Sequence, residues 1–290
     1  MLEFYSPFQT MYKVNPETGL GTFPKLESLG VANFVTHDSK IWGNRQAMWA
    51  KDPEEKKFIA DKDQEIAKLL GAKLILTLTT PIEPTLLNYD SATHQTILKS
   101  IVKEKGDIPS TLIRANAIIM RVPEIEVEIT PGDCAVILVV HPQFNGFIMA
   151  HVGCPQTIQG LLTSTINLWL SQETGLDSSR AEIFITPYIC KEHFVHDPQT
   201  FPNFNTHHAP LKDFLTEDKQ NGKMHCDFMG FIKKQLNSEF GITKIYETGL
   251  CPYEEAEKGN LFSHTRTKQD PEAYPEARFS VSMSLLPNHP

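Results

Sequence analysis

The stretch that decides the fold is Gly132-Asp-Cys-Ala-Val-Ile-Leu-Val-Val-His-Pro-Gln-Phe-Asn-Gly-Phe-Ile-Met-Ala-His151. Two apolar runs flank a turn rich in proline, asparagine and glycine, and this pattern predicts an antiparallel β-hairpin. The outer ends of a hairpin meet, so His151 should lie opposite or diagonal to a residue near Cys134, on the order of 7 Å away by backbone. A thiolate and an imidazole at that separation can share a metal ion or a proton.

The next segment, Val152-Gly-Cys-Pro-Gln-Thr157, turns at Gly153 into a helix with Pro155 at its first position. His151 therefore ends a strand that faces a helix N-terminus, where backbone N–H groups favour an anion. The alternative is that Cys134 is a small buried side chain and His151 a core histidine bonded to a backbone carbonyl. The turn from His151 into a helix N-terminus favours a chemical site over this alternative.

Outward from the hairpin, strands and helices alternate along the chain. A mixed β-sheet covered by helices, an α/β (α+β) fold, is therefore expected, and an all-parallel sheet fits less well because neighbouring strands are joined too tightly for crossovers. Further strands are expected at 31–36, 73–79, 118–120, 124–129, 182–186, 244–247 and 279–286, and helices from 52 to 71 and at 92–105, 157–170 and 225–240.

Composition excludes several classes of protein. The 290 residues are expected to form a single domain, and the net charge of −8 comes without a basic block, so nucleic acid is not an expected partner. No apolar run approaches the roughly 20 residues that cross a bilayer and no signal peptide is evident, so a cytoplasmic protein without a membrane partner is expected. The five widely spaced cysteines should be reduced thiols.

Several stretches follow the order of motifs in one known family. They are Gly132-Asp-Cys134, His151-Val-Gly-Cys-Pro-Gln-Thr157, Thr186-Pro-Tyr-Ile-Cys-Lys-Glu-His-Phe-Val195, Gly249-Leu-Cys-Pro-Tyr253, Phe262-Ser-His-Thr-Arg266 and Glu276-Ala-Arg278. With these motifs the chain resembles the laccase-domain family, first labelled multicopper polyphenol oxidoreductases and now regarded as zinc-containing purine nucleoside phosphorylases with adenosine deaminase activity. The resemblance implies one laccase-like domain over 1–290, with a divergent N-terminal part at 1–115 and the best-matching part at 116–290.

The resemblance also implies a metal site. Cys134 and His151 match two of the family's zinc ligands, but the histidine of its Gln-Val-His-Gly motif has no counterpart at 79–84. His94 or His37 is the candidate substitute, and we expect zinc at low occupancy, in preference to copper, because catalytic zinc normally has three protein ligands.

Three further residues are candidates for binding substrate or phosphate. Arg266 and Arg278 stand where the family has arginines, and could replace the helix-start arginine that is Pro155 here, although surface ion pairing is the alternative. Cys154, at the helix start, is either a thiol with a lowered pKa or a small filler. His193 and His196 are expected to be surface residues of a proline-rich loop.

The function expected from the resemblance is that of a purine nucleoside phosphorylase or adenosine deaminase-type enzyme with a partly degenerate metal site. Its small-molecule partners would be a purine nucleoside and phosphate. Two alternatives stay open: a metal-free hydrolase or deamidase with Cys134 as nucleophile and His151 as base, and a pseudoenzyme that binds a small molecule or a protein partner.

Overall fold

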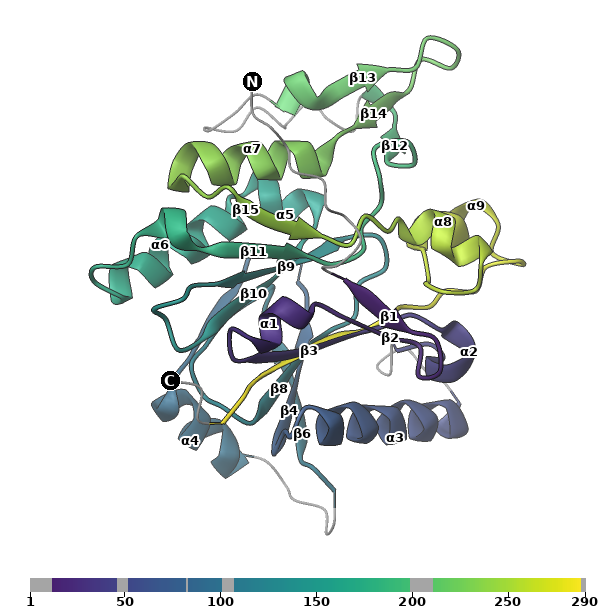
Figure 1. Ribbon diagram of the computed structural model, residues 1–290. Coiled ribbons are helices and arrows are strands. Elements are labelled where there is room, and N and C mark those ends of the chain that lie inside the picture. The colour runs from purple at the N-terminus through teal and green to yellow at the C-terminus, as the bar shows by residue number, and fades with distance from the viewer. Residues whose placement is uncertain (1–11, 46–51, 82, 101–106, 199–210, 288–290) are drawn as a thin grey trace.

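The computed structural model describes residues 12–45, 52–81, 83–100, 107–198 and 211–287. In this part of the chain two large β-sheets are stacked face to face, a small third sheet lies at one end, and helices cover the outer faces (Figure 1). Both large sheets mix parallel and antiparallel neighbours. The predicted fold, a mixed sheet covered by helices, is confirmed.

The first sheet has seven strands among the described residues. The central strand β16 runs antiparallel to both of its neighbours, β3 and β8, whereas β4 runs parallel to β8 and β6. In spatial order the strands are β1 (Lys13–Asn15), β2 (Leu20–Thr22), β3 (Val31–Thr36), β16 (Val281–Leu285), β8 (Ile125–Ile129), β4 (Leu74–Thr79) and β6 (Ser110–Arg114).

The second sheet contains the predicted hairpin at its centre, and six of its strands lie in the described residues. Their spatial order is β15 (Lys244–Glu247), β11 (Glu182–Ile185), β9 (Ala135–Val140), β10 (Phe147–Val152), β7 (Ala117–Met120) and β5 (Leu86–Tyr89). The small third sheet consists of β12 (Val195–His196), β14 (Met224–Cys226) and β13 (Leu215–Glu217).

Helices pack on the outer faces of the sheets. Residues of α6 and α7 share an apolar cluster with the second sheet, and α3 shares another with the first. The helices are α1 (Pro24–Glu27), α2 (Ser39–Trp42), α3 (Pro53–Leu69), α4 (Ser91–Ser100), α5 (Cys154–Ile158), α6 (Leu161–Gln172), α7 (Phe228–Phe240), α8 (Pro252–Glu257) and α9 (His264–Gln269), with 3-10 turns at Ser178–Arg180 and Leu211–Phe214. In the described chain, no helix combines the length and apolar character needed to span a membrane.

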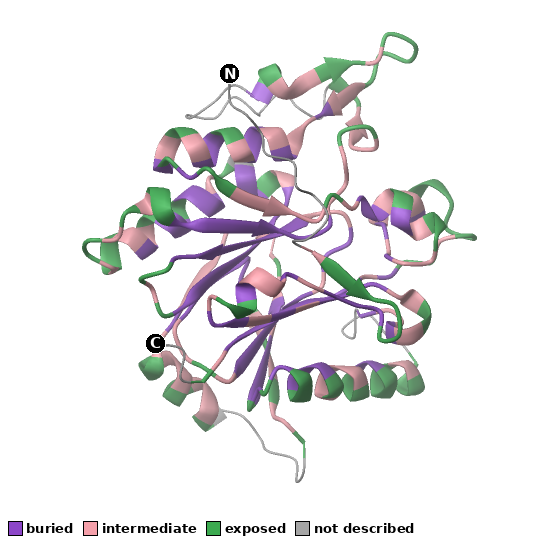
Figure 2. Ribbon diagram, viewed as in Figure 1, coloured by how far each residue is buried: buried purple, intermediate pink, exposed green. Residues whose placement is uncertain are grey.

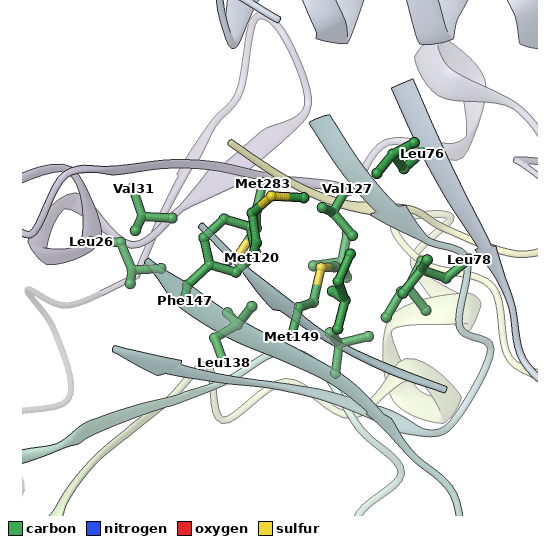
Figure 3. Close-up of a cluster of buried hydrophobic side chains, with 14 of the residues drawn as sticks. Leu26, Val31, Leu76, Leu78, Met120, Val127, Leu138, Phe147, Met149 and Met283 are labelled. Atoms are coloured by element: carbon green, nitrogen blue, oxygen red, sulfur yellow. The ribbon is translucent and has the colours of Figure 1, made fainter. Parts of the chain in front are cut away.

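The largest apolar cluster fills the layer between the two large sheets (Figures 2 and 3). Side chains alternate along a strand, so Leu138 of β9 and Met149 of β10 face Val127 of the first sheet, while Ile137 and Ile148 face the helices. This alternation determines which hairpin residues face the inter-sheet layer.

Two helix predictions were wrong in their boundaries. The helix expected at 157–170 is two helices, because Gly160 between α5 and α6 adopts a left-handed backbone conformation with φ of 72°. The helix expected from residue 225 begins at Phe228, where the Asp227 side chain accepts a hydrogen bond from the backbone N–H of Gly230. The residues before that cap form β14, a strand too short to show a periodic pattern.

Candidate functional site

The hairpin brings Cys134 and His151 to one point. β9 and β10 pair with His151 opposite Val136, so Cys134, two residues before Val136, is a diagonal neighbour on the same face of the sheet. A Cβ atom added to Gly153 would lie 3.4 Å from Cys134 Sγ and 3.6 Å from His151 Cε1. Both side chains therefore converge beside Gly153, at the end of the inter-sheet layer.

Burial sets the protonation of this pair. It lowers the pKa of His151 to about 4, helped by the positive charge of Arg278. It also raises the pKa of the Cys134 thiol to about 12; the nearby Asp133 carboxylate adds to this, and Arg278 partly opposes it. At neutral pH both groups are uncharged, so the site holds no preformed thiolate–imidazolium pair of the kind that cysteine hydrolases use.

The pair has the chemistry of two metal ligands. His151 Nδ1 is buried, and the described residues give it no hydrogen-bond partner. An orphaned buried ring nitrogen is uncommon, and an imidazole beside a cysteine thiol suits zinc. Cys134 and His151 therefore fit two positions of a zinc site.

A pocket of about 1350 Å³ opens at this point, and it extends along the first sheet to α3. Residues of α3, of the end of β4 and of most of β6 line it on one side, and the segment 130–134 with His151 lines it on another. The pocket is large enough for a nucleoside and an anion. The charged and imidazole side chains that line it are Arg45, Lys56, Asp63, Arg114, Glu128, Asp133, His151, His264 and Arg278.

The structure separates the two arginines that the sequence grouped. Arg278 lines the pocket, where its Nη1 donates to the Ala277 carbonyl (2.9 Å) and its Nη2 to Glu276 Oε1 (2.8 Å). Arg266 is not among the lining residues: its guanidinium stacks 3.8 Å from the ring centroid of Tyr253 and pairs with Glu257. Arg278 is thus the one of the two placed to meet a pocket anion.

The other candidates lie elsewhere or differ in character. His94 bonds to the hydroxyl of Tyr89 (3.1 Å), the buried His37 bonds to the hydroxyl of Tyr12, and neither lines the pocket. The structure therefore does not bring either proposed third ligand to the site. Cys154 is the first residue of α5, after the N-cap Gly153, and burial raises its thiol pKa, which favours the small filler over the thiol with a lowered pKa.

A buried ion cluster in the pocket wall was missed from the sequence. The Arg45 side chain is fully buried and pairs with Asp63 and, at 3.2 Å, with Glu128. No local pattern marks this contact, because the three residues lie far apart in the chain. Glu128 compensates the charge of Arg45, whereas burial and the neighbouring Glu128 raise the pKa of Asp63 to about 8. The other cations that line the pocket are Lys56, Arg114 and Arg278.

Comparisons with known proteins agree with this fold. A 157-residue alignment with purine nucleoside phosphorylase Cj1217c of Campylobacter jejuni shows 23% identity and covers 54% of this chain and 63% of that relative. Two solved structures share the fold: hypothetical protein YfiH of Bacillus licheniformis (TM-score 0.74, 15% identity, 97% of this chain and 100% of that one) and YlmD of Geobacillus stearothermophilus (TM-score 0.72, 14% identity, 96% and 99%).

The family itself is shown by a longer match. The sequence model described as multi-copper polyphenol oxidoreductase laccase matches residues 61–271, well over half of the chain. That stretch contains the hairpin, the helix start after it and every pocket-lining residue except Arg45, Lys56, Ala60 and Arg278. The chain therefore belongs to the multi-copper polyphenol oxidoreductase laccase family.

Proposed function

We propose that this chain is a purine nucleoside phosphorylase, with adenosine deaminase activity at the same site. The observation that carries the proposal is the convergence of a buried, unpartnered His151 Nδ1 and the Cys134 thiol in a pocket that Arg278 also lines. The Campylobacter relative that is named a purine nucleoside phosphorylase supports the choice of substrate class.

We assign phosphate and the nucleoside to different residues of the pocket. Arg278 binds the phosphate, because a guanidinium offers paired N–H donors to phosphate oxygens. Leu78 of the apolar inter-sheet layer also lines the pocket, and an apolar lining strengthens the attraction between Arg278 and the anion. Zinc held by Cys134 and His151 would supply a Lewis acid beside the bound nucleoside.

The metal-free alternative lacks electrostatic support. A nucleophilic cysteine needs a lowered thiol pKa, and its basic partner needs to accept that proton near neutral pH. Burial shifts both pKa values away from what this chemistry needs: it raises the pKa of Cys134 and lowers the pKa of His151. We therefore favour the metal-dependent nucleoside reaction over a hydrolase or deamidase.

The test is incubation of the purified chain with inosine or adenosine, with and without phosphate, followed by chromatography of the bases. Release of hypoxanthine or adenine that requires phosphate is expected, together with conversion of adenosine to inosine. The C134S and H151A variants should lose both activities. C226A is the matched control, because Cys226 is a buried cysteine outside the pocket.

Other results would redirect the proposal. Turnover that survives a strong chelator but disappears in C134S would support the cysteine hydrolase. Binding of nucleoside without any turnover, in protein with a full metal complement, would support a pseudoenzyme.

A further inference from the structure

A second cluster of metal-type ligands lies outside the pocket. It consists of Cys190, His193, Cys251 and Glu254, whose ligand atoms all lie within 4.8 Å of one another. We propose that these four residues form a second metal site that binds one Zn²⁺ ion per chain, and we call them the Cys-His-Cys-Glu cluster. None of the four lines the Cys134 and His151 pocket, so the two sites are distinct.

Four of the six distances between ligand atoms in the cluster match those of a tetrahedral zinc site. His193 Nδ1 lies 3.1 Å from Cys190 Sγ, 3.7 Å from Cys251 Sγ and 3.6 Å from Glu254 Oε1. Cys190 Sγ lies 3.9 Å from the same carboxylate oxygen. Bonds of about 2.0–2.3 Å from zinc to nitrogen, oxygen and sulfur place neighbouring ligands about 3.3–3.8 Å apart, so these four separations agree to within about 0.5 Å, and the two remaining pairs lie within 4.8 Å.

Two short backbone turns present these ligands. The backbone N–H groups of His193 and Phe194 both donate to the Cys190 carbonyl, which folds Cys190-Lys-Glu-His193 into a tight turn. Cys251 caps α8, and the N–H of Glu254 donates to its carbonyl, so Cys251-Pro-Tyr-Glu254 repeats the same three-residue spacing. Paired ligands at such spacing are typical of structural zinc sites.

Direct contacts hold the two turns together. The backbone N–H of Cys190 donates to Cys251 Sγ at 3.2 Å, and that of Tyr188 donates to the Leu250 carbonyl at 3.2 Å. An N–H that points at the sulfur stabilises a thiolate ligand. The His193 ring stacks on Tyr253, with ring centroids 4.2 Å apart, which fixes the plane of the imidazole.

Hydrogen bonds through His193 Nδ1 alone cannot hold all four side chains together. His193 Nδ1 carries either one proton or one lone pair, so it can satisfy one of the two sulfurs or the carboxylate, but not all three. A cation at the centre satisfies all four groups at once. Two sulfurs and one imidazole select zinc over magnesium or calcium, which prefer oxygen ligands.

Burial indicates a structural site with one accessible side. Cys251 is buried, Cys190 and His193 are half-buried, and the side chain of Glu254 is 54% exposed. The ion would enter past the carboxylate, and four protein ligands would leave no open position for substrate. The bound ion would fasten the segment before β12 to α8, at the end of the molecule where α8 and α9 lie (Figure 1).

Elemental analysis of purified variants of the full chain tests the proposal. We expect about one zinc per chain after dialysis against a mild chelator, and we expect this zinc to remain in the C134S/H151A double variant and in C226A. It should be lost from C190S/C251S and from H193Q. With cobalt in place of zinc, the thiolate-to-cobalt charge-transfer band should persist in C134S/H151A and fall by about half in C190S.

E254Q covers the case in which the cysteine variants fail to fold. Because Glu254 is largely exposed, this variant should fold, keep the two-thiolate cobalt band and release zinc faster to a chelator. The proposal is overturned if the zinc disappears with Cys134 and His151 but survives in C190S/C251S. It is also overturned if the freshly purified chain, kept without chelator, carries no zinc at the cluster, or if mass spectrometry shows Cys190 and Cys251 joined as a disulfide.

Discussion

Replacement of Arg278 by glutamine should weaken phosphate binding selectively. The guanidinium lines the pocket with only 14% of its side chain exposed, and it carries more N–H donors than its contacts with Ala277 and Glu276 use. A hydrogen bond from a charged donor contributes about 1.5–3 kcal/mol. Because Glu276 is 55% exposed and partly offsets the charge, we expect the lower end of this range, which is about a 10- to 30-fold rise in the KM for phosphate.

Arg266 supplies the matched control. R266Q removes the same charge from a residue that pairs with Glu257 outside the pocket, so its phosphate KM should stay within about twofold of wild type. The assay is phosphorolysis of inosine at varied phosphate, and the phosphate-induced rise in Tm gives a reading independent of turnover. Equal losses in R278Q and R266Q, or an unchanged phosphate response in R278Q, would refute the assignment of the anion site to Arg278.

Three further perturbations follow from the described contacts. G153A should reduce nucleoside turnover and lower the unfolding free energy by about 1 kcal/mol. The new Cβ would lie 2.6 Å from Gln156 Oε1 and displace the Gln156 side chain, which bonds to the Pro81 carbonyl. Enzyme kinetics measure the first effect and urea unfolding the second. The pKa of His37 is about 4 in the folded state and about 6.5 in the unfolded state, so the folded state binds fewer protons as the pH falls. Between pH 6.5 and pH 4 the unfolding free energy of the wild type should therefore fall by about 3 kcal/mol more than that of H37Q. Urea unfolding at each pH measures this difference. L138A should cost about 2–5 kcal/mol in the same assay, because Leu138 is fully buried between the sheets, and a loss below 1 kcal/mol would contradict that packing.

The hairpin could be predicted because its information is local. Two apolar runs and a turn with fixed chemistry define β9 and β10, and the side chains of each strand alternate between its two faces. The same alternation places Cys134 and His151 on one face, so their proximity follows from strand geometry alone. Helix α3 was equally readable, because its N-cap Asp52 and Pro53 are local signals.

The rest of the pocket depends on tertiary contacts that leave no local pattern. Nothing near Arg45 in the sequence shows that it pairs with Glu128, which lies on a strand of the first sheet. Arg266 and Arg278 both stand in arginine-containing motifs, but Arg266 lies on α9 outside the pocket, whereas Arg278 lines the pocket. Sequence reasoning could name these residues but could not choose between them.

His193 shows how a local signal can be misjudged. It was expected to be a surface residue because its loop is rich in proline, yet it lies among two cysteines and a glutamate. The informative pattern was the pairing of Cys190 with His193 and of Cys251 with Glu254 at equal spacing. Each pair is common by itself, and only the contact between the loop and α8 joins them.

Asp133 physically connects the two sites. Its backbone carbonyl accepts a hydrogen bond from the N–H of Ile189, one residue before Cys190, and its carboxylate binds the Ser263 hydroxyl and the N–H of Thr265 at the start of α9. Its neighbour in the chain is Cys134. The segment that contains Cys190 is therefore hydrogen-bonded to Asp133, the residue before Cys134. An ion in the proposed cluster would restrain the position of the Cys134 backbone, so a metal that takes no part in the proposed reaction would still help to keep Cys134 and His151 in place.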